Sequence, residues 1–265
     1  MSRVLCLILV LMPLTLAACA RNESSGAGNL SASNRSGSQR DGAQSRLNVA
    51  AAAEASGRPE IALSMYAAAV RQDPRNAETV SRYAVALARS GDIAAARTAL
   101  VGPLRADPDN PALLRAIAAV QLQSGHATEA EALFARVLTI APSDTRAMDG
   151  QAVALDMQGR YGAAERLHRT AQAADPGNIR FSNNLAISLM LAGHMGDALA
   201  ILEPLRFRSD APERVTTNFA LVQVVMDGGS AKASREASIV LEAQASRPEI
   251  ATMIAALAGQ ETPRP

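Results

Sequence analysis

The sequence repeats itself with a period of 34 residues. Glycine, proline and alanine recur at this step in four separate series, too many for coincidence. The series are Gly57, Gly91, Gly125, Gly159 and Gly193; Pro74, Pro108, Pro142 and Pro176; Ala50, Ala84, Ala118, Ala152, Ala186 and Ala220; and Ala62, Ala96, Ala130, Ala164 and Ala198. Units of this length stack on one another, and each contacts only its neighbours. The period therefore predicts a stacked array without one large core, which the aromatic content of 3% also fits.

Each unit is predicted to contain two helices. In the first unit we expect a helix over 43–56, a left-handed cap at Gly57 and a second helix over 59–72, which Pro74 ends. The alanines at the eighth and twentieth positions are small because the two helices cross there. The twenty-fourth position fills the gap between units with Tyr66, Leu100, Phe134, His168 and Leu202. The units begin at Ala43, Ala77, Pro111, Thr145, Ile179 and Glu213.

This pattern resembles the tetratricopeptide repeat family. The resemblance implies an all-α fold: a right-handed α-solenoid of about six helix-turn-helix repeats over residues 43–247, followed by a capping helix and a frayed tail over 248–265. Pro103 and Pro204 fall inside second helices. Because an interior proline removes a hydrogen bond and kinks a helix, we expect these two helices to be short or bent. Asn184 and Asn218 share the sixth position and are interpreted as structural.

Residues 1–18 predict a signal peptide, because Arg3 precedes an apolar run that is too short for a membrane anchor. The run ends at Leu-Ala-Ala before Cys19, which leaves two interpretations: ordinary cleavage after small residues, or a lipoprotein signal. The tetrapeptide resembles the lipobox of bacterial lipoproteins. This resemblance implies lipid attachment at Cys19 and, because Ala20 stands where inner-membrane lipoproteins carry aspartate, an outer-membrane protein that faces the periplasm. Residues 19–42 are polar and predict a flexible tether.

No sequence motif indicates catalysis. A glycine-rich phosphate loop, Gly-x-Ser-x-Gly and His-Glu-x-x-His are all absent. Cys6 lies in the signal peptide and Cys19 at the lipid site, so no thiol remains for a metal or a nucleophile. His126 and His194 fall in turns, and His168 falls at a packing position. We therefore expect no cofactor, no metal and no enzyme activity, and 26 basic against 25 acidic residues argue against nucleic acid.

The family resemblance also implies a protein-binding groove on a concave face, lined by the second, fifth, ninth, twelfth and thirteenth positions of the units. In the last three units these positions are mostly apolar, with three arginines along one edge. The predicted groove residues are Arg146, Val153, Met157, Arg180, Asn183, Ile187, Met190, Leu191, Arg214, Leu221, Val224 and Val225. They suit an amphipathic helix or an extended peptide. The alternative is that the arginines are simply solvated and that some apolar positions pack against neighbouring helices.

The C-terminal half resembles one group more closely, the TadD family of lipoproteins from Flp (tight adherence) pilus assembly. The resemblance lies in Asn-Asn-Leu-Ala-Ile-Ser-Leu at 183–189, Leu-Glu-Pro-Leu at 202–205, and Asn-Phe-Ala-Leu at 218–221. It implies a non-catalytic adaptor or pilotin for the Flp (type IVb) pilus, whose partner is the pilus secretin or another assembly component. The long tether and an extra residue near Gly228 depart from the family. The alternative is a repeat lipoprotein of another envelope complex, such as a type IV pilus pilotin or cell-wall machinery.

Overall fold

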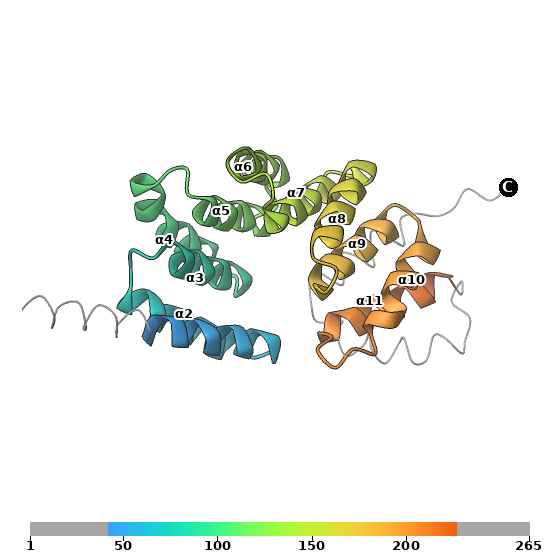
Figure 1. Ribbon diagram of the computed structural model, residues 1–265, viewed down its shortest axis with the longest axis horizontal. Coiled ribbons are helices and arrows are strands. Elements are labelled where there is room, and N and C mark those ends of the chain that lie inside the picture. The colour runs from blue at the N-terminus through green and yellow to red at the C-terminus, as the bar shows by residue number, and fades with distance from the viewer. Residues whose placement is uncertain (1–41, 227–265) are drawn as a thin grey trace, which may run out of the picture. The chain divides into compact units, whose positions relative to one another are not determined.

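The computed structural model describes residues 42–226, and every regular element in that range is a helix (Figure 1). A helix over 42–55 is followed by α2 (Pro59–Gln72), α3 (Ala77–Arg89), α4 (Ile93–Ala106), α5 (Pro111–Gln123), α6 (Ala127–Ile140), α7 (Thr145–Met157), α8 (Tyr161–Ala174), α9 (Ile179–Leu191), α10 (Met195–Leu205) and α11 (Glu213–Met226). The all-α class is confirmed. The predicted signal peptide, Cys19, the predicted tether up to residue 41 and the predicted capping helix and tail over 248–265 lie outside the described residues.

The helix boundaries follow the predicted 34-residue register. The first helices of the later repeats start at Ala77, Pro111, Thr145, Ile179 and Glu213, as expected. Asn110, Asp144 and Asn178 precede α5, α7 and α9, and each side chain accepts a hydrogen bond from a backbone N–H of the first turn. These caps satisfy donors that have no partner within the helix, and so they define where each helix begins.

A glycine in the left-handed conformation ends the first helix of each of the first five repeats. Gly125 has a φ of 79°. Its N–H bonds to the carbonyl of Leu122 at 3.0 Å, and the N–H of His126 bonds to that of Gln121 at 2.9 Å. Glycine suits this cap because it has no Cβ to clash at positive φ. The same pair of bonds recurs at Gly57, Gly91, Gly159 and Gly193, so the predicted caps are confirmed.

The chain divides into two compact units between Thr79 and Val80. In the first unit, two hydrogen bonds join the helix over 42–55 to α2. The Tyr66 hydroxyl donates to the Glu54 carboxylate at 3.0 Å, and the Arg46 guanidinium donates to the Gln72 side chain. The buried apolar side chains of this unit are mostly small: Ala43, Leu47, Ala50, Ala53, Ala62, Tyr66 and Ala69.

In the second unit, α5, α7, α9 and α11 contact one another in order, and α6, α8 and α10 each pack between two successive members of that row. The row brings together the first helices of the repeats. The alanines at the eighth and twentieth positions are buried along this unit, as the crossing argument predicts. They are Ala84, Ala118, Ala152, Ala186 and Ala220 in the first helices, and Ala96, Ala130, Ala164 and Ala198 in the second helices.

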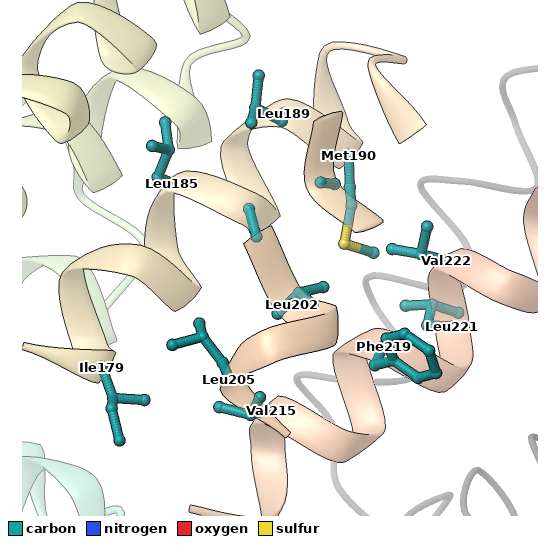
Figure 2. Close-up of a cluster of buried hydrophobic side chains, with 12 residues drawn as sticks. Ile179, Leu185, Leu189, Met190, Leu202, Leu205, Val215, Phe219, Leu221 and Val222 are labelled. Atoms are coloured by element: carbon teal, nitrogen blue, oxygen red, sulfur yellow. The ribbon is translucent and has the colours of Figure 1, made fainter. Parts of the chain in front are cut away.

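The largest apolar cluster joins α9, α10 and α11 (Figure 2). Leu202, the twenty-fourth residue of its repeat, is fully buried in this cluster together with Leu185 of α9 and Val215 of α11. A second cluster places the twenty-fourth residue Phe134 against α7. The residue that faces its ring is Gly150, where an added Cβ would lie 2.3 Å from the Phe134 ring. The aromatic ring and the missing side chain therefore fit each other.

The two interior prolines have different effects. α10 ends one residue after Pro204 and has 11 residues, against 14 in α6 and α8. α4 keeps 14 residues and continues through Pro103, so it is not shortened. The residue before Pro103 is Gly102, whereas Glu203 precedes Pro204. Proline disfavours the helical conformation of the preceding residue partly by a clash with its Cβ, which glycine lacks. The continuous α4 is therefore consistent with Gly102.

Gly150→Ala should destabilise the protein by about 1–3 kcal/mol, because the new methyl group overpacks the Phe134 ring. Gly162→Ala in α8 is the matched control: its Cβ would meet nothing within 4 Å, so helix propensity should make it neutral or stabilising. Urea unfolding of both variants measures the difference. Adding Phe134→Leu to Gly150→Ala should recover part of the loss; a Gly150→Ala protein as stable as the parent would show that the contact is not tight.

Candidate functional site

The twelve predicted groove residues all lie on three adjacent first helices, α7, α9 and α11. These helices contact one another in sequence. Positions two, nine and thirteen of a repeat are separated by seven and four residues, so they lie on one face of the helix. Positions five and twelve are turned to the side of that face. The candidate site therefore consists of equivalent positions on three successive first helices, each of which contributes one face.

Three members of the set are buried. Asn183 accepts a hydrogen bond from the Asn218 side chain at 2.9 Å, which links α9 to α11. Met190 and Leu221 belong to the apolar cluster of these helices (Figure 2). In this structure they hold helices together and offer no surface to a partner. For these three positions the packing interpretation fits better than the groove interpretation. Asn183 and Met190 occupy the side-facing fifth and twelfth positions of their repeat, whereas Leu221 occupies the ninth position of its repeat and is nevertheless buried in the cluster.

The other nine residues are exposed or half-buried, and we call them the first-helix face. They comprise six apolar residues, named here the apolar strip, and three arginines: Val153, Met157, Ile187, Leu191, Val224 and Val225, with Arg146, Arg180 and Arg214. Met157 and Val225 are 49% and 37% exposed. Apolar side chains gathered on adjoining helices are a common feature of protein-binding surfaces. Whether these nine contact a partner remains a prediction.

The three arginines each occupy the second position of their helix, and their charges are close enough to influence one another. Burial lowers the pKa of Arg180; the Asp149 charge opposes this, while Arg146 and Arg89 lower it further. The pKa of Arg214 is likewise lowered by burial and by the charges of Arg89 and Arg180, although its side chain reaches solvent. Arginine remains protonated despite such shifts. The helix starts therefore carry a cluster of positive charge.

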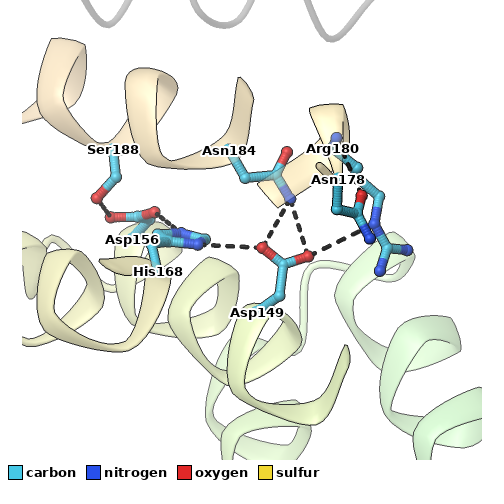
Figure 3. Close-up of polar contacts among 7 residues, drawn as sticks. All are labelled: Asp149, Asp156, His168, Asn178, Arg180, Asn184 and Ser188. Carbon is cyan, nitrogen blue, oxygen red and sulfur yellow. Dashed lines mark hydrogen bonds and ion pairs between the residues drawn. The ribbon is translucent and has the colours of Figure 1, made fainter. Parts of the chain in front are cut away.

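A largely buried polar network connects α7, α8 and α9, and Arg180 of the first-helix face lies at its edge (Figure 3). The two ring nitrogens of His168 lie 3.1 Å from Asp149 Oδ1 and 3.1 Å from Asp156 Oδ2. Asn184 donates to both oxygens of Asp149 at 3.1 Å, and the Ser188 hydroxyl donates to Asp156 at 2.8 Å. The side chain of His168 is fully buried. The imidazole therefore does not reach solvent, whereas Arg180 at the edge of the network is partly exposed.

The charges in the network favour the protonated form of His168. Burial alone lowers the pKa of His168, but the hydrogen bonds to Asp149 and Asp156 and the charges of both carboxylates outweigh it, so the pKa is raised above 6.5. Arg180 adds a second cation, with Nε 3.8 Å from Asp149 Oδ2. Two carboxylates therefore face one imidazolium and one guanidinium, which balances the buried charge.

The sequence placed His168 correctly in the core but did not reveal its partners. Asp149 and Asp156 are seven residues apart on α7, which puts them on one side of the helix. That spacing, together with a histidine where other repeats carry leucine or an aromatic residue, was the available signal, because a buried charge requires a partner. The sixth-position Asn184 and Asn218 both bond to the preceding first helix, which supports their structural interpretation.

Within residues 42–226 no group of three or more histidine, cysteine or acidic side chains is placed to hold a metal ion. In the same range, none of the helices has the length and apolar character needed to cross a membrane. His126 and His194 occupy turn positions at the starts of α6 and α10, as predicted. The chemistry that this site supports is contact with another molecule through apolar side chains and positive charge.

Because folding raises the pKa of His168, the folded state binds more protons than the unfolded state above about pH 6.5. The stabilisation is fully present below that pH and is lost as pH rises through the folded pKa. We expect the free energy of unfolding to fall by up to about 1.4 kcal/mol per pH unit in that window. Urea titrations between pH 6 and 9 measure it; His194→Gln should keep the slope, and a flat profile in the parent would contradict the assignment.

His168→Leu should cost about 3–5 kcal/mol, because it leaves the buried carboxylate of Asp156 without a cation and that of Asp149 with only Arg180. The neighbouring repeats suggest substitutions that should compensate for the lost histidine. The residues equivalent to Asp149, Asp156, His168 and Ser188 in the following repeat are Asn183, Met190, Leu202 and Val222, respectively. The protein with His168→Leu, Asp149→Asn, Asp156→Met and Ser188→Val should therefore regain most of the lost stability, as measured by thermal unfolding. If the fourfold variant is no more stable than His168→Leu, unpaired charge is not the cause of the loss.

Comparison with known proteins identifies the family to which these repeats are similar. Two models described as tetratricopeptide repeat match the sequence, one over residues 53–104 and 157–217 and the other over 84–145 and 113–179. Together they cover 53–217 without a gap, which is more than half of the chain. No curated protein matches the sequence.

Among solved structures, a thermophilic tetratricopeptide-repeat protein from Thermus thermophilus superposes with a TM-score of 0.60 and 15% identity, over 68% of this chain and 98% of that one. PilW, a type IV pilus biogenesis factor, superposes with a TM-score of 0.56 and 19% identity, over 80% of this chain and 98% of PilW. PilF from Pseudomonas aeruginosa superposes with a TM-score of 0.53 and 12% identity, over 83% of this chain and 99% of PilF. These similarities show the fold. With the repeat models and the helix register, they establish that this chain belongs to the tetratricopeptide repeat family.

Proposed function

We propose that the protein is a non-catalytic, lipid-anchored scaffold that binds a protein partner on its first-helix face. The observation that carries the proposal is the apolar strip, which leaves Met157 of α7 and Val225 of α11 substantially exposed on either side of α9, on the helices that carry the three arginines. Covering exposed apolar surface is favourable, by about 25 cal/mol per Å². Tetratricopeptide repeats are protein-interaction modules, so membership of this family also supports a role in binding a protein partner.

Within that role, we propose that the protein serves Flp (type IVb) pilus assembly at the outer membrane, facing the periplasm, with a secretin or another assembly component as partner. The support is the resemblance of residues 183–189, 202–205 and 218–221 to the TadD family and the lipobox at Cys19. A type IV pilus pilotin is the second candidate, which the fold shared with PilW and PilF favours.

Replacing Met157 and Val225 together by aspartate should weaken partner capture at least tenfold, because charged side chains in the apolar strip must lose their hydration on binding. Both residues are exposed, so the protein should remain folded. The matched control is Val101→Asp with Ile140→Asp, which changes two residues of similar exposure on second helices. The measurement is quantitative co-purification of secretin and other pilus proteins from the source bacterium. Equal capture by both variants would rule out this face.

Cys19→Ala should release the protein from the outer-membrane fraction, because lipid chains on this residue supply the membrane affinity. Membrane fractionation and mass spectrometry of the mature N-terminus measure the effect. The repeat array should retain its circular dichroism spectrum, since residue 19 lies well before the first described helix. A Cys19→Ala protein that stays in the outer membrane and supports normal pilus numbers would contradict the anchoring proposal.

A further inference from the structure

The contacts between successive repeats change character where α9 meets α7 and α8, a boundary that we call the α8–α9 junction. One apolar cluster joins α5, α6 and α7, another lies between α7 and α8, and the largest joins α9, α10 and α11. In the part of the chain that the structure describes, none of these three clusters contains residues from both sides of the junction. Several polar contacts do cross it.

Three side chains of α9 reach across the junction to two largely buried carboxylates of α7 (Figure 3). Asn184 donates to both oxygens of Asp149 at 3.1 Å, and Nε of Arg180 lies 3.8 Å from the same carboxylate. One turn further along α9, the Ser188 hydroxyl donates to Asp156 at 2.8 Å. These contacts of α9 therefore persist only while both carboxylates stay buried.

His168 of α8 lies between the two carboxylates and can donate to both only as a cation. Its ring nitrogens are 3.1 Å from Asp149 and 3.1 Å from Asp156. An imidazolium donates from both nitrogens, whereas a neutral imidazole has one N–H and presents a lone pair to the second carboxylate. Loss of one proton therefore removes a hydrogen bond and leaves a repulsive contact inside the protein.

The helices packed against α8 bring few other charges to this histidine. Besides the two carboxylates, α7 carries the exposed Arg146, and the charged residue of α9 is Arg180. The remaining charged residues of α8, an ion pair and one exposed arginine, are Glu165, Arg169 and Arg166. When the imidazole is neutral, the two carboxylates face Arg180 alone. Because a buried charge without a partner is unfavourable, the neutral form favours entry of water at the junction.

We propose that the α8–α9 junction is a pH-sensitive latch: the proton on His168 keeps it closed, and loss of that proton opens it while the repeats on either side stay folded. The apolar clusters lie to one side or the other, so they can persist when the junction opens. The first-helix face crosses the junction, with Met157 on one side and Ile187 on the other. Opening therefore divides that face. This consequence for binding rests on the proposed function, whereas the latch itself does not.

The direction of the pH effect follows from how the closed junction holds the proton. Burial lowers the pKa of His168, but the hydrogen bonds to Asp149 and Asp156 and the charges of both outweigh burial and raise it above 6.5. In an open junction the imidazole is in water, and its pKa returns to about 6.5. Between these two values the closed junction binds one proton more than the open one, so each pH unit raises the equilibrium constant for opening about tenfold.

A thiol in place of the Ser182 hydroxyl can report the opening. Ser182 lies on α9 and is buried, and its hydroxyl accepts a hydrogen bond from the Gln172 side chain of α8 at 2.9 Å, across the junction. Ser182→Cys changes one atom and places a thiol where a reagent can reach it only when the junction opens. The unsubstituted protein gives the background labelling, and circular dichroism checks the fold of the variant.

Labelling with dithionitrobenzoate is followed for the full chain in detergent between pH 6 and 9. A flexible peptide with one cysteine, labelled at each pH, corrects for ionisation of the thiol. The protection, which is the labelling rate of the peptide divided by that of Ser182→Cys, should fall about tenfold per pH unit above about pH 6.5 and then level off. If the protection is the same at pH 6 and pH 9, the junction does not respond to His168 and the proposal is overturned.

Dilute urea separates opening of the junction from unfolding of the whole array. Urea promotes a transition in proportion to the surface that the transition exposes. At pH 8.5 the urea dependence of labelling should therefore be less than about half that of global unfolding, measured on the same variant by circular dichroism. An equal dependence would mean that the reagent reaches the thiol only through global unfolding, which also overturns the proposal.

Two changes to the network, each made together with Ser182→Cys, test the role of the histidine. Asp156→Asn keeps the size of the side chain, and a neutral imidazole can accept a hydrogen bond from the new amide, so the fall in protection should be at least threefold smaller. The fourfold variant with His168→Leu has no titratable group left between the helices and should lose the pH dependence. His194→Gln is the control and should retain it. Full pH dependence in the fourfold variant would show that other groups control the junction.

The latch and the proposed function fail separately. Met157→Asp with Val225→Asp changes exposed residues outside the network, so it should leave the pH dependence of labelling as it is even where it abolishes partner capture. Partner capture that depends on these two residues, in a protein whose labelling does not depend on pH, overturns the latch and leaves the proposed function standing.

Discussion

Close crossing of helices at two alanine positions is the constraint on which the rest of this structure depends. Ala118, Ala152 and Ala186 in first helices, and Ala130 and Ala164 in second helices, have no exposed surface. A small side chain at each crossing lets two backbones approach, and the left-handed glycine between them turns the chain back at a fixed angle. Repeating this arrangement every 34 residues aligns the first helices in a row, so equivalent positions of successive repeats form a continuous surface. The first-helix face, with its three arginines, is a product of that alignment.

Much of this could be predicted from the sequence, because the constraints are local and repeated. The helix starts at Thr145, Ile179 and Glu213 follow from the period, and the glycine caps follow from the lack of a Cβ. The positions that contact across repeats were less predictable. Met190 and Leu221 satisfy the family's groove positions, yet the neighbouring helices bury them. Their burial depends on how far each first helix is rotated relative to the next, and a sequence pattern with one period does not specify that rotation.

The polar network is a second case in which the sequence did not reveal contacts between repeats. A histidine at a packing position indicates a buried side chain, but its partners come from a different helix of the same repeat, and Asn184 and Ser188 come from the next repeat. The adjoining repeat fills the corresponding positions with Asn183, Met190 and Leu202. One junction is therefore held by charged groups and the next by apolar packing together with the Asn218–Asn183 hydrogen bond, although both use the same backbone arrangement. Buried ions add little net stability compared with apolar packing, although removal of one partner of a buried pair is costly.

The central claim is that one face of α7, α9 and α11 holds the partner. Site-specific photo-crosslinking in the cells that produce the protein tests it most directly. A photoreactive amino acid is placed in turn at Met157, Ile187 and Val225, and at Val101 and Ile140 on second helices. The account predicts that the three first-helix positions crosslink to the same protein and that the two second-helix positions do not. Crosslinks to a shared partner from positions 101 and 140, with none from 157, 187 or 225, would contradict it.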